Sequence, residues 1–109
     1  MIEKDIQKSI LAYLQYKKGW FVWKNKNQGT YNPVTKTFYN NSTKKGISDI
    51  LGMTTKGRFI AVEVKTIQGL RKFERNKFKL GTTEFYENQF LEQVKVNGGI
   101  GILATSVED

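Results

Sequence analysis

The chain has 109 residues and a formal net charge of +8, and it contains neither cysteine nor histidine. Disulfides, thiolate or imidazole metal sites, and catalysis by cysteine or histidine are therefore excluded, so any bound metal must have oxygen ligands. The length fits a single domain over residues 1–109, and the positive charge indicates nucleic acid as the first candidate partner. We expect no membrane span, because no stretch is long and apolar enough to cross a bilayer. We also expect no export, and therefore a cytoplasmic location, because the N-terminal residues carry acids and lack the apolar core of a signal peptide.

The first part of the chain predicts a helix, a strand and a polar insert. Apolar residues at fourfold spacing from Ile2 to Leu14 are typical of an amphipathic helix, which we expect to end at Gly19. The aromatic and β-branched residues 20–26 predict a strand. Residues 27–45 are polar and rich in turn formers, and they predict a loop or a small hairpin.

The centre of the chain predicts a β-hairpin. Residues 46–53 and 58–66 have strand patterns, and the turn-forming residues 54–57 join them. On the second strand, Glu63 and Lys65 stand two positions apart, so both side chains leave the same face.

Three charged residues of this hairpin form a candidate site. Asp49 lies on the first strand and can approach Glu63 across the pair. Two carboxylates on one face repel each other unless a divalent cation lies between them, and such hard oxygen ligands suit Mg²⁺, with Mn²⁺ also possible. Lys65 can hold a nucleophilic water or neutralise charge on a phosphate. The alternative is a surface ion pair of Glu63 and Lys65 on an edge strand, with Asp49 as a turn residue.

The last part of the chain predicts a basic loop, a helix and a strand. Residues 68–81 are rich in lysine and arginine and are interpreted as the loop. Residues 82–99 predict the helix, and residues 100–106 predict the strand. The expected apolar stripe of the helix consists of Tyr86, Phe90 and Val94. The whole order predicts an α/β fold with a small mixed central β-sheet flanked by helices.

The ordered set of motifs resembles the VRR-NUC nucleases, a family of the PD-(D/E)XK superfamily. The resemblance covers most of the chain, and no single motif in it is specific. It rests on Glu3 and Gln7 in the first helix, on residues 46–52, 57–66 and 97–106, and on Gln89. One departure is Ser48, which stands where the superfamily often has a proline before the aspartate.

The resemblance implies a restriction-endonuclease-like core (α-β-β-β-α-β) and Mg²⁺-dependent cleavage of DNA by direct hydrolysis. It implies that Asp49, Glu63 and the main-chain carbonyl of Val64 bind the metal and that Lys65 is the catalytic lysine. By the same resemblance, Glu3 would complete the metal site and Gln89 would lie close to it as a further catalytic residue. From the residues alone, Glu3 can equally be a helix N-terminal acid, and Gln89 can be a partly buried structural glutamine.

Basic residues supply the expected DNA contacts. Phe73 and Phe78 lie among them, and we expect these two rings to anchor the basic segment to the core. Stacking of these rings on unpaired bases is the alternative. The predicted DNA-binding residues are Lys44, Lys45, Arg71, Lys72, Arg75, Lys77 and Lys79.

The expected protein is a homodimeric, metal-dependent endodeoxyribonuclease for branched DNA such as Holliday junctions, as in stand-alone members of the resembled family. A phage or bacterial origin is suspected, although no residue shows the source. Two alternatives stay open. One is a DNA-binding module without activity, and the other is a restriction-type enzyme that cuts a defined duplex sequence.

Overall fold

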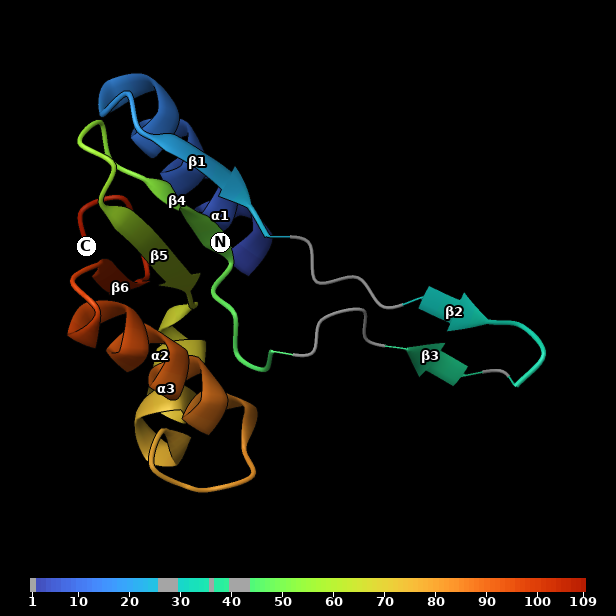
Figure 1. The fold of residues 1–109 in the computed structure, drawn as a ribbon. Coiled ribbons are helices and arrows are strands. Elements are labelled where there is room, and N and C mark those ends of the chain that lie inside the picture. Colours follow the sequence, from blue (N-terminus) through green and yellow to red (C-terminus); the bar gives the residue numbers. More distant parts are fainter. Residues whose placement is uncertain (1, 26–29, 36, 40–43) are drawn as a thin grey trace.

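The structure, a computed structural model, describes residues 2–25, 30–35, 37–39 and 44–109. It confirms the predicted α/β class, with helices on a mixed four-stranded sheet (Figure 1). Across the described residues, no helix has the length and apolar character needed to cross a lipid bilayer. The elements in chain order are α1 (Glu3–Ala12) with a π-helical turn (Tyr13–Lys17), β1 (Phe21–Lys24), β2 (Thr30–Asn32), β3 (Thr37–Tyr39), β4 (Ile50–Met53), β5 (Phe59–Val64), α2 (Ile67–Asn76), α3 (Thr83–Val96) and β6 (Ile100–Ala104).

The main sheet has the strand order β1-β4-β5-β6, so β5 is an interior strand. β1, β4 and β5 pair antiparallel, whereas β6 runs parallel to β5. The predicted hairpin of β4 and β5 is confirmed, and its turn is closed by the Thr54 amide, which donates to the Arg58 carbonyl at 2.9 Å. Ile50 pairs with Val62 in this hairpin. Continued by one residue, this register sets residue 49 opposite residue 63.

The two faces of the sheet are covered by different helices. Ile60, Val62 and Val64 belong to the core cluster on the α1 side, whose α1 members and π-turn member are Ile6, Ile10 and Leu14. Ala61, on the opposite face, packs with Leu91 and Val94 of α3. Figure 1 shows α1 behind the strands and α3 against β6. Because side chains alternate along a strand, residue 63 shares the α3 side with Ala61.

The insert contains the small hairpin that the polar segment predicts. β2 and β3 pair antiparallel and form a two-stranded sheet of their own. Figure 1 draws this hairpin apart from the four-stranded sheet. Residues 27–29, 36 and 40–43 of the expected loop, and residue 26 of the expected strand before it, lie outside the described residues.

The interpretation of residues 68–81 as a loop is wrong, because most of this segment forms α2. Thr66 caps the helix, and its hydroxyl oxygen accepts a hydrogen bond from the Gly69 amide at 3.0 Å. Phe73 is buried and holds the helix against the body of the protein. The dense positive charge hides this pattern in the sequence, so the chain has one helix more than the predicted order.

The predicted apolar stripe of α3 is rotated from the face that the structure buries. Tyr86 and Phe90 are only half-buried, whereas Val94 is buried as expected. The buried residues of α3 are Glu84, Glu87, Leu91 and Val94. Two of these are acidic, so hydrophobic spacing alone selects a neighbouring face of the helix.

Gly46 allows the segment before β4 to contact α3 closely. It has a φ of +76°, and a Cβ atom at this position would overlap the main-chain carbonyl of Tyr86. Both features require glycine, the first because of backbone strain and the second because of space. The contact fixes residues 44–49 against the helix that covers the site side of the sheet.

We predict that Gly46→Ala destabilises the protein by about 2–5 kcal/mol, because backbone strain of about 1–2 kcal/mol adds to overpacking of about 1–3 kcal/mol. Urea unfolding measures this loss. Gly57→Ala is the matched control, since Gly57 has a similar φ of +80° but a Cβ added there would meet no atom within 4 Å. Equal losses in the two variants would contradict the close contact at Gly46.

Candidate functional site

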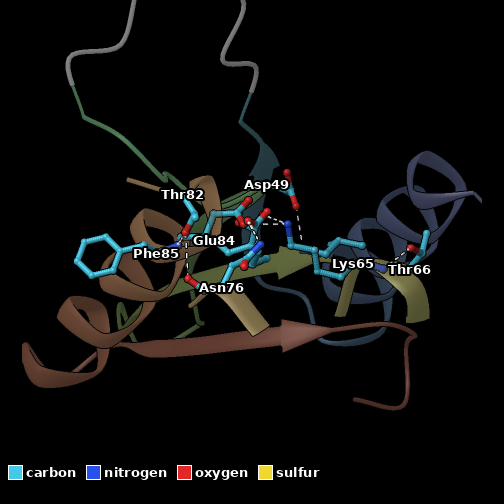
Figure 2. Close-up of polar contacts among 11 residues, drawn as sticks. Asp49, Lys65, Thr66, Asn76, Thr82, Glu84 and Phe85 are labelled. Carbon is cyan, nitrogen blue, oxygen red and sulfur yellow. Dashed lines mark hydrogen bonds and ion pairs between the residues drawn. The ribbon is translucent and has the colours of Figure 1, made fainter. Parts of the chain in front are cut away.

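The structure brings Asp49, Glu63 and Lys65 together at one end of β4 and β5, as the hairpin register predicts. Asp49 immediately precedes β4, and its Oδ2 accepts a hydrogen bond from the Val64 amide at 2.8 Å. Glu63 is only 2% exposed. Lys65 immediately follows β5, and its Nζ lies 3.9 Å from Glu63 Oε1. Figure 2 shows the side chains of Asp49 and Lys65 converging at this place.

Glu87 of α3 is a member of the site that the sequence analysis missed. Lys65 Nζ donates a hydrogen bond to Glu87 Oε1 at 2.8 Å, so this ion pair is shorter than the one with Glu63. Glu87 is buried on the same face of α3 as Leu91 and Val94. A glutamate that recurs at helical spacing with core residues is the sequence signal that could have identified it. We name Asp49, Glu63, Lys65 and Glu87 the charged cluster.

The expectation that Gln89 faces partly inward is wrong, because its side chain is exposed. Gln89 lines an open groove beside Lys44 and Lys45 instead. The side chain of Glu87, two positions earlier, points inward and contacts Lys65. Residues two apart on a helix point about 200° apart, so the two side chains cannot share one direction.

The interpretation of Glu63 and Lys65 as a surface ion pair on an edge strand is also wrong. β5 is interior, and the side chains of Glu63 and Lys65 are 3% and 12% exposed. Glu63 Oε2 is buried and has no hydrogen-bond partner among the described residues. An unsatisfied buried carboxylate oxygen is costly, and natural proteins keep such groups chiefly where they serve a function or bind an ion.

Burial strongly disfavours the ionised form of Glu63. Loss of solvent, a hydrogen bond with the Glu87 carboxylate and the charge of Asp49 together raise the pKa of Glu63 to about 11. Burial also raises the pKa of Asp49, although the hydrogen bond from the Val64 amide opposes this change. The cluster therefore holds a carboxyl that keeps its proton at neutral pH unless another cation replaces that proton.

Lys65 is held in its charged form. Burial alone would lower the pKa of Lys65, but the hydrogen bond and charge of Glu87, followed by the charges of Glu63 and Glu3, outweigh burial and raise it. Lys65 is thus a fixed positive charge and is not suited to remove a proton from water at neutral pH. Both predicted roles of Lys65, to hold a nucleophilic water and to neutralise charge on a phosphate, are compatible with this fixed charge.

The part of the chain that the structure describes contains no ready metal site. No three of its carboxylates are grouped closely enough to hold a metal ion as they stand. The Lys65 ammonium already lies between the carboxylates of Glu63 and Glu87. The donor set still fits a hard divalent cation, because Asp49 and Glu63 supply oxygens and one Glu63 oxygen is unsatisfied.

Glu3 and Val64 are the other two predicted metal-site residues. Glu3 is the first residue of α1, and burial, followed by the charge of Asp49, raises its pKa. The charge of Lys65 also acts on Glu3, so this acid belongs to the electrostatic surroundings of the charged cluster. The Val64 amide, rather than its carbonyl, makes the observed contact with Asp49.

The predicted DNA-binding residues fall into two groups on different segments of the chain. Lys44 and Lys45 are exposed beside α3, and the Lys45 ammonium lies 4.9 Å from the ring centre of Tyr86. The others lie on or after α2, where Lys77 is paired with Glu74 at 2.8 Å. The exposed members of this second group are Arg71, Lys72, Arg75 and Lys79.

The two phenylalanines of the basic segment differ in their positions. The prediction that Phe73 anchors the segment is confirmed, since it is buried. The same prediction is wrong for Phe78, which is 80% exposed just beyond the end of α2. The α2–α3 connection is instead held by polar contacts, in which Asn76 Nδ2 donates to Glu84 Oε1 at 3.1 Å (Figure 2).

Comparison with known proteins gives no relative for this chain. No family model matches it, and no curated protein or solved structure is significantly similar to it.

We predict that Glu63→Gln stabilises the metal-free protein, by an amount that increases with pH. Folded Glu63 keeps its proton up to a pKa of about 11, whereas the unfolded chain releases it near 4.5, so the wild-type protein loses stability across this range as pH rises. An uncharged amide avoids this loss and can donate to Glu87. In EDTA at about pH 8.5, we expect a gain of at least about 1 kcal/mol, or roughly 4 °C in Tm.

Thermal unfolding at about pH 5 and about pH 8.5 measures the effect, with Glu92→Gln as the control. Glu92 is an exposed helical glutamate paired with Lys95, so its replacement should change Tm little at either pH. A Glu63→Gln variant that is less stable than wild type at the higher pH would contradict the protonated state of Glu63.

Proposed function

We propose that the protein is a Mg²⁺-dependent endodeoxyribonuclease that hydrolyses phosphodiester bonds, with Mn²⁺ as a substitute ion. The observation that carries this proposal is the charged cluster, in which Asp49 is bonded to the Val64 amide next to Glu63, and the buried Glu63 Oε2 has no partner among the described residues. A surface salt bridge or a structural core would not need such an arrangement. The resemblance of the ordered motifs to VRR-NUC nucleases points to the same chemistry.

Each residue of the cluster has a role in this proposal. The carboxylates of Asp49 and Glu63 would hold the ion, which supplies Lewis-acid polarisation of the phosphodiester when it is bound. Lys65 stabilises negative charge on the phosphate, because its pKa is raised and it remains protonated. Glu87 positions Lys65 through the 2.8 Å ion pair. Glu3 adds negative charge near the ion.

DNA is the proposed polymer because the chain carries a net charge of +8 and because Lys44 and Lys45 are exposed in the segment that leads to Asp49. The exposed face of α2 offers a second set of cations for a neighbouring stretch of backbone. A branched substrate, and a homodimer that carries two cleavage sites, are parts of the same proposal that rest on the resemblance.

The second candidate is a DNA-binding module that lacks activity. One observation favours it, namely that no three carboxylates of the described residues form a ready metal site. The presence of all three charged residues of the motif favours the nuclease. Cleavage assays separate the two candidates directly.

We predict that the wild-type protein cleaves branched DNA in Mg²⁺ or Mn²⁺ and that Asp49→Ala and Lys65→Ala each lower the rate by about 10²-fold or more. The first variant removes an ion ligand, and the second removes the fixed charge beside the phosphate. Labelled linear, flap and four-way DNA substrates, each with Mg²⁺, Mn²⁺ or EDTA, measure the rate and the preferred structure.

Lys56→Ala is the matched control for Lys65→Ala, because it removes the same charge from the exposed turn between β4 and β5. It should retain activity within about twofold, as surface substitutions usually do. Cleavage that persists in EDTA or in both site variants would refute the nuclease site. Binding without any cleavage would support the DNA-binding module.

A further inference from the structure

A groove of about 720 Å³ lies along α3, on the side of the helix that faces away from the core. Three kinds of side chain line it. The cations are Lys44 and Lys45, the aromatic rings are Tyr86 and Phe90, and amides are supplied by Gln89 and Gln93. Lys45 lies over the Tyr86 ring, so a cation–π contact holds its ammonium at the edge of the groove.

The groove continues beyond Phe90 into a second hollow of about 320 Å³. Lys44, Phe90 and Gln93 line both spaces, and Phe59 of β5 is added in the second. Phe59 is 43% exposed, and Phe90 is half-buried. We name the two adjoining hollows the channel, which is lined by lysines, aromatic rings and amide groups.

This channel is joined to the charged cluster through the main chain. Residues 44–49 lead from the two lysines at its edge to Asp49, and Gly46 sits against the carbonyl of Tyr86. Tyr86 in the channel directly precedes Glu87 in the cluster. The position of the channel is therefore tied to that of Asp49 through residues 44–49, and to that of Glu87 through α3.

We infer that the channel binds unpaired nucleotides of a nucleic-acid strand. Phosphates are complementary to the two lysines, and the flat ring of Phe90 suits a base that is not paired. The amides of Gln89 and Gln93 can donate to and accept from base edges. Paired bases have their faces covered by stacking, so a duplex could use the lysines but not the ring. This inference rests on the proposed function, because it assigns the single-stranded part of a branched substrate to a groove on α3, the helix that also supplies Glu87.

The test measures binding in EDTA, so that no cleavage is required. A fluorescein-labelled oligothymidine of about 12 nucleotides and a blunt duplex of equal length are titrated with protein, and anisotropy is followed. We expect the oligothymidine to bind more tightly than the duplex. Phe90→Leu, which keeps the apolar contacts of the residue, should weaken oligothymidine binding about tenfold and leave duplex binding within about twofold.

Lys45→Gln and Lys56→Gln form the charge-matched pair. Lys45→Gln should weaken oligothymidine binding about tenfold, whereas Lys56→Gln, which removes an equal charge from a residue that lines neither hollow, should change it by less than about threefold. Because Lys45 is exposed, its variant keeps the test decisive even if Phe90→Leu unfolds. Equal losses for the two lysine variants, or equal affinity of wild type for the two DNAs, would overturn the inference.

The outcome also separates this inference from the nuclease proposal. If the wild-type protein never cleaves DNA in Mg²⁺ but the channel variants lose oligothymidine binding, the channel stands and the nuclease proposal fails. If the protein cleaves DNA but folded Phe90→Leu and Lys45→Gln bind oligothymidine normally, the nuclease proposal stands and the channel inference fails.

Discussion

Charge balance in a space with little access to solvent is the constraint on which the site depends. Glu63 and Glu87 are buried, Asp49 is close by, and Lys65 is the cation that contacts them. A single ammonium cannot neutralise three carboxylates, so one of them, Glu63, keeps a proton and leaves an oxygen unsatisfied. A divalent cation would relieve both conditions at once, because it replaces the proton and supplies the missing partner. The same requirement explains why acids occupy positions that the fold would otherwise fill with apolar side chains.

A hairpin and one helix bring the charged residues of the cluster together. The register of β4 and β5 aligns residue 49 with residue 63, and alternation along β5 gives one face to the α1 core and the other to α3. Glu87 of α3, the helix that packs on this second face, forms an ion pair with Lys65. Gly46 permits the segment before Asp49 to contact α3 directly. α3 contributes residues to both the cluster and the channel.

Much of this arrangement follows from short-range patterns. A strand period of two predicts that Glu63 and Lys65 share a face, and a tight turn predicts that Asp49 approaches them. The buried face of α3 is harder to predict from the sequence. Apolar residues occur on several sides of this helix, so more than one face could be buried. The face that buries Glu87 is selected by contact with Lys65, which is 22 positions away. α2 was missed because exposed cations outnumber the single buried anchor, Phe73. The buried face of α3 and the formation of α2 both depend on tertiary contacts more than on local propensity.

The most direct test of the account is to find where a divalent ion binds. Anomalous diffraction from crystals of the wild-type protein soaked in Mn²⁺ locates the ion independently of any activity. The account predicts a peak within about 2.0–2.6 Å of carboxylate oxygens of Asp49 and Glu63. It would be contradicted by crystals saturated with Mn²⁺ that show no peak there, with the Lys65 ammonium still lying between Glu63 and Glu87.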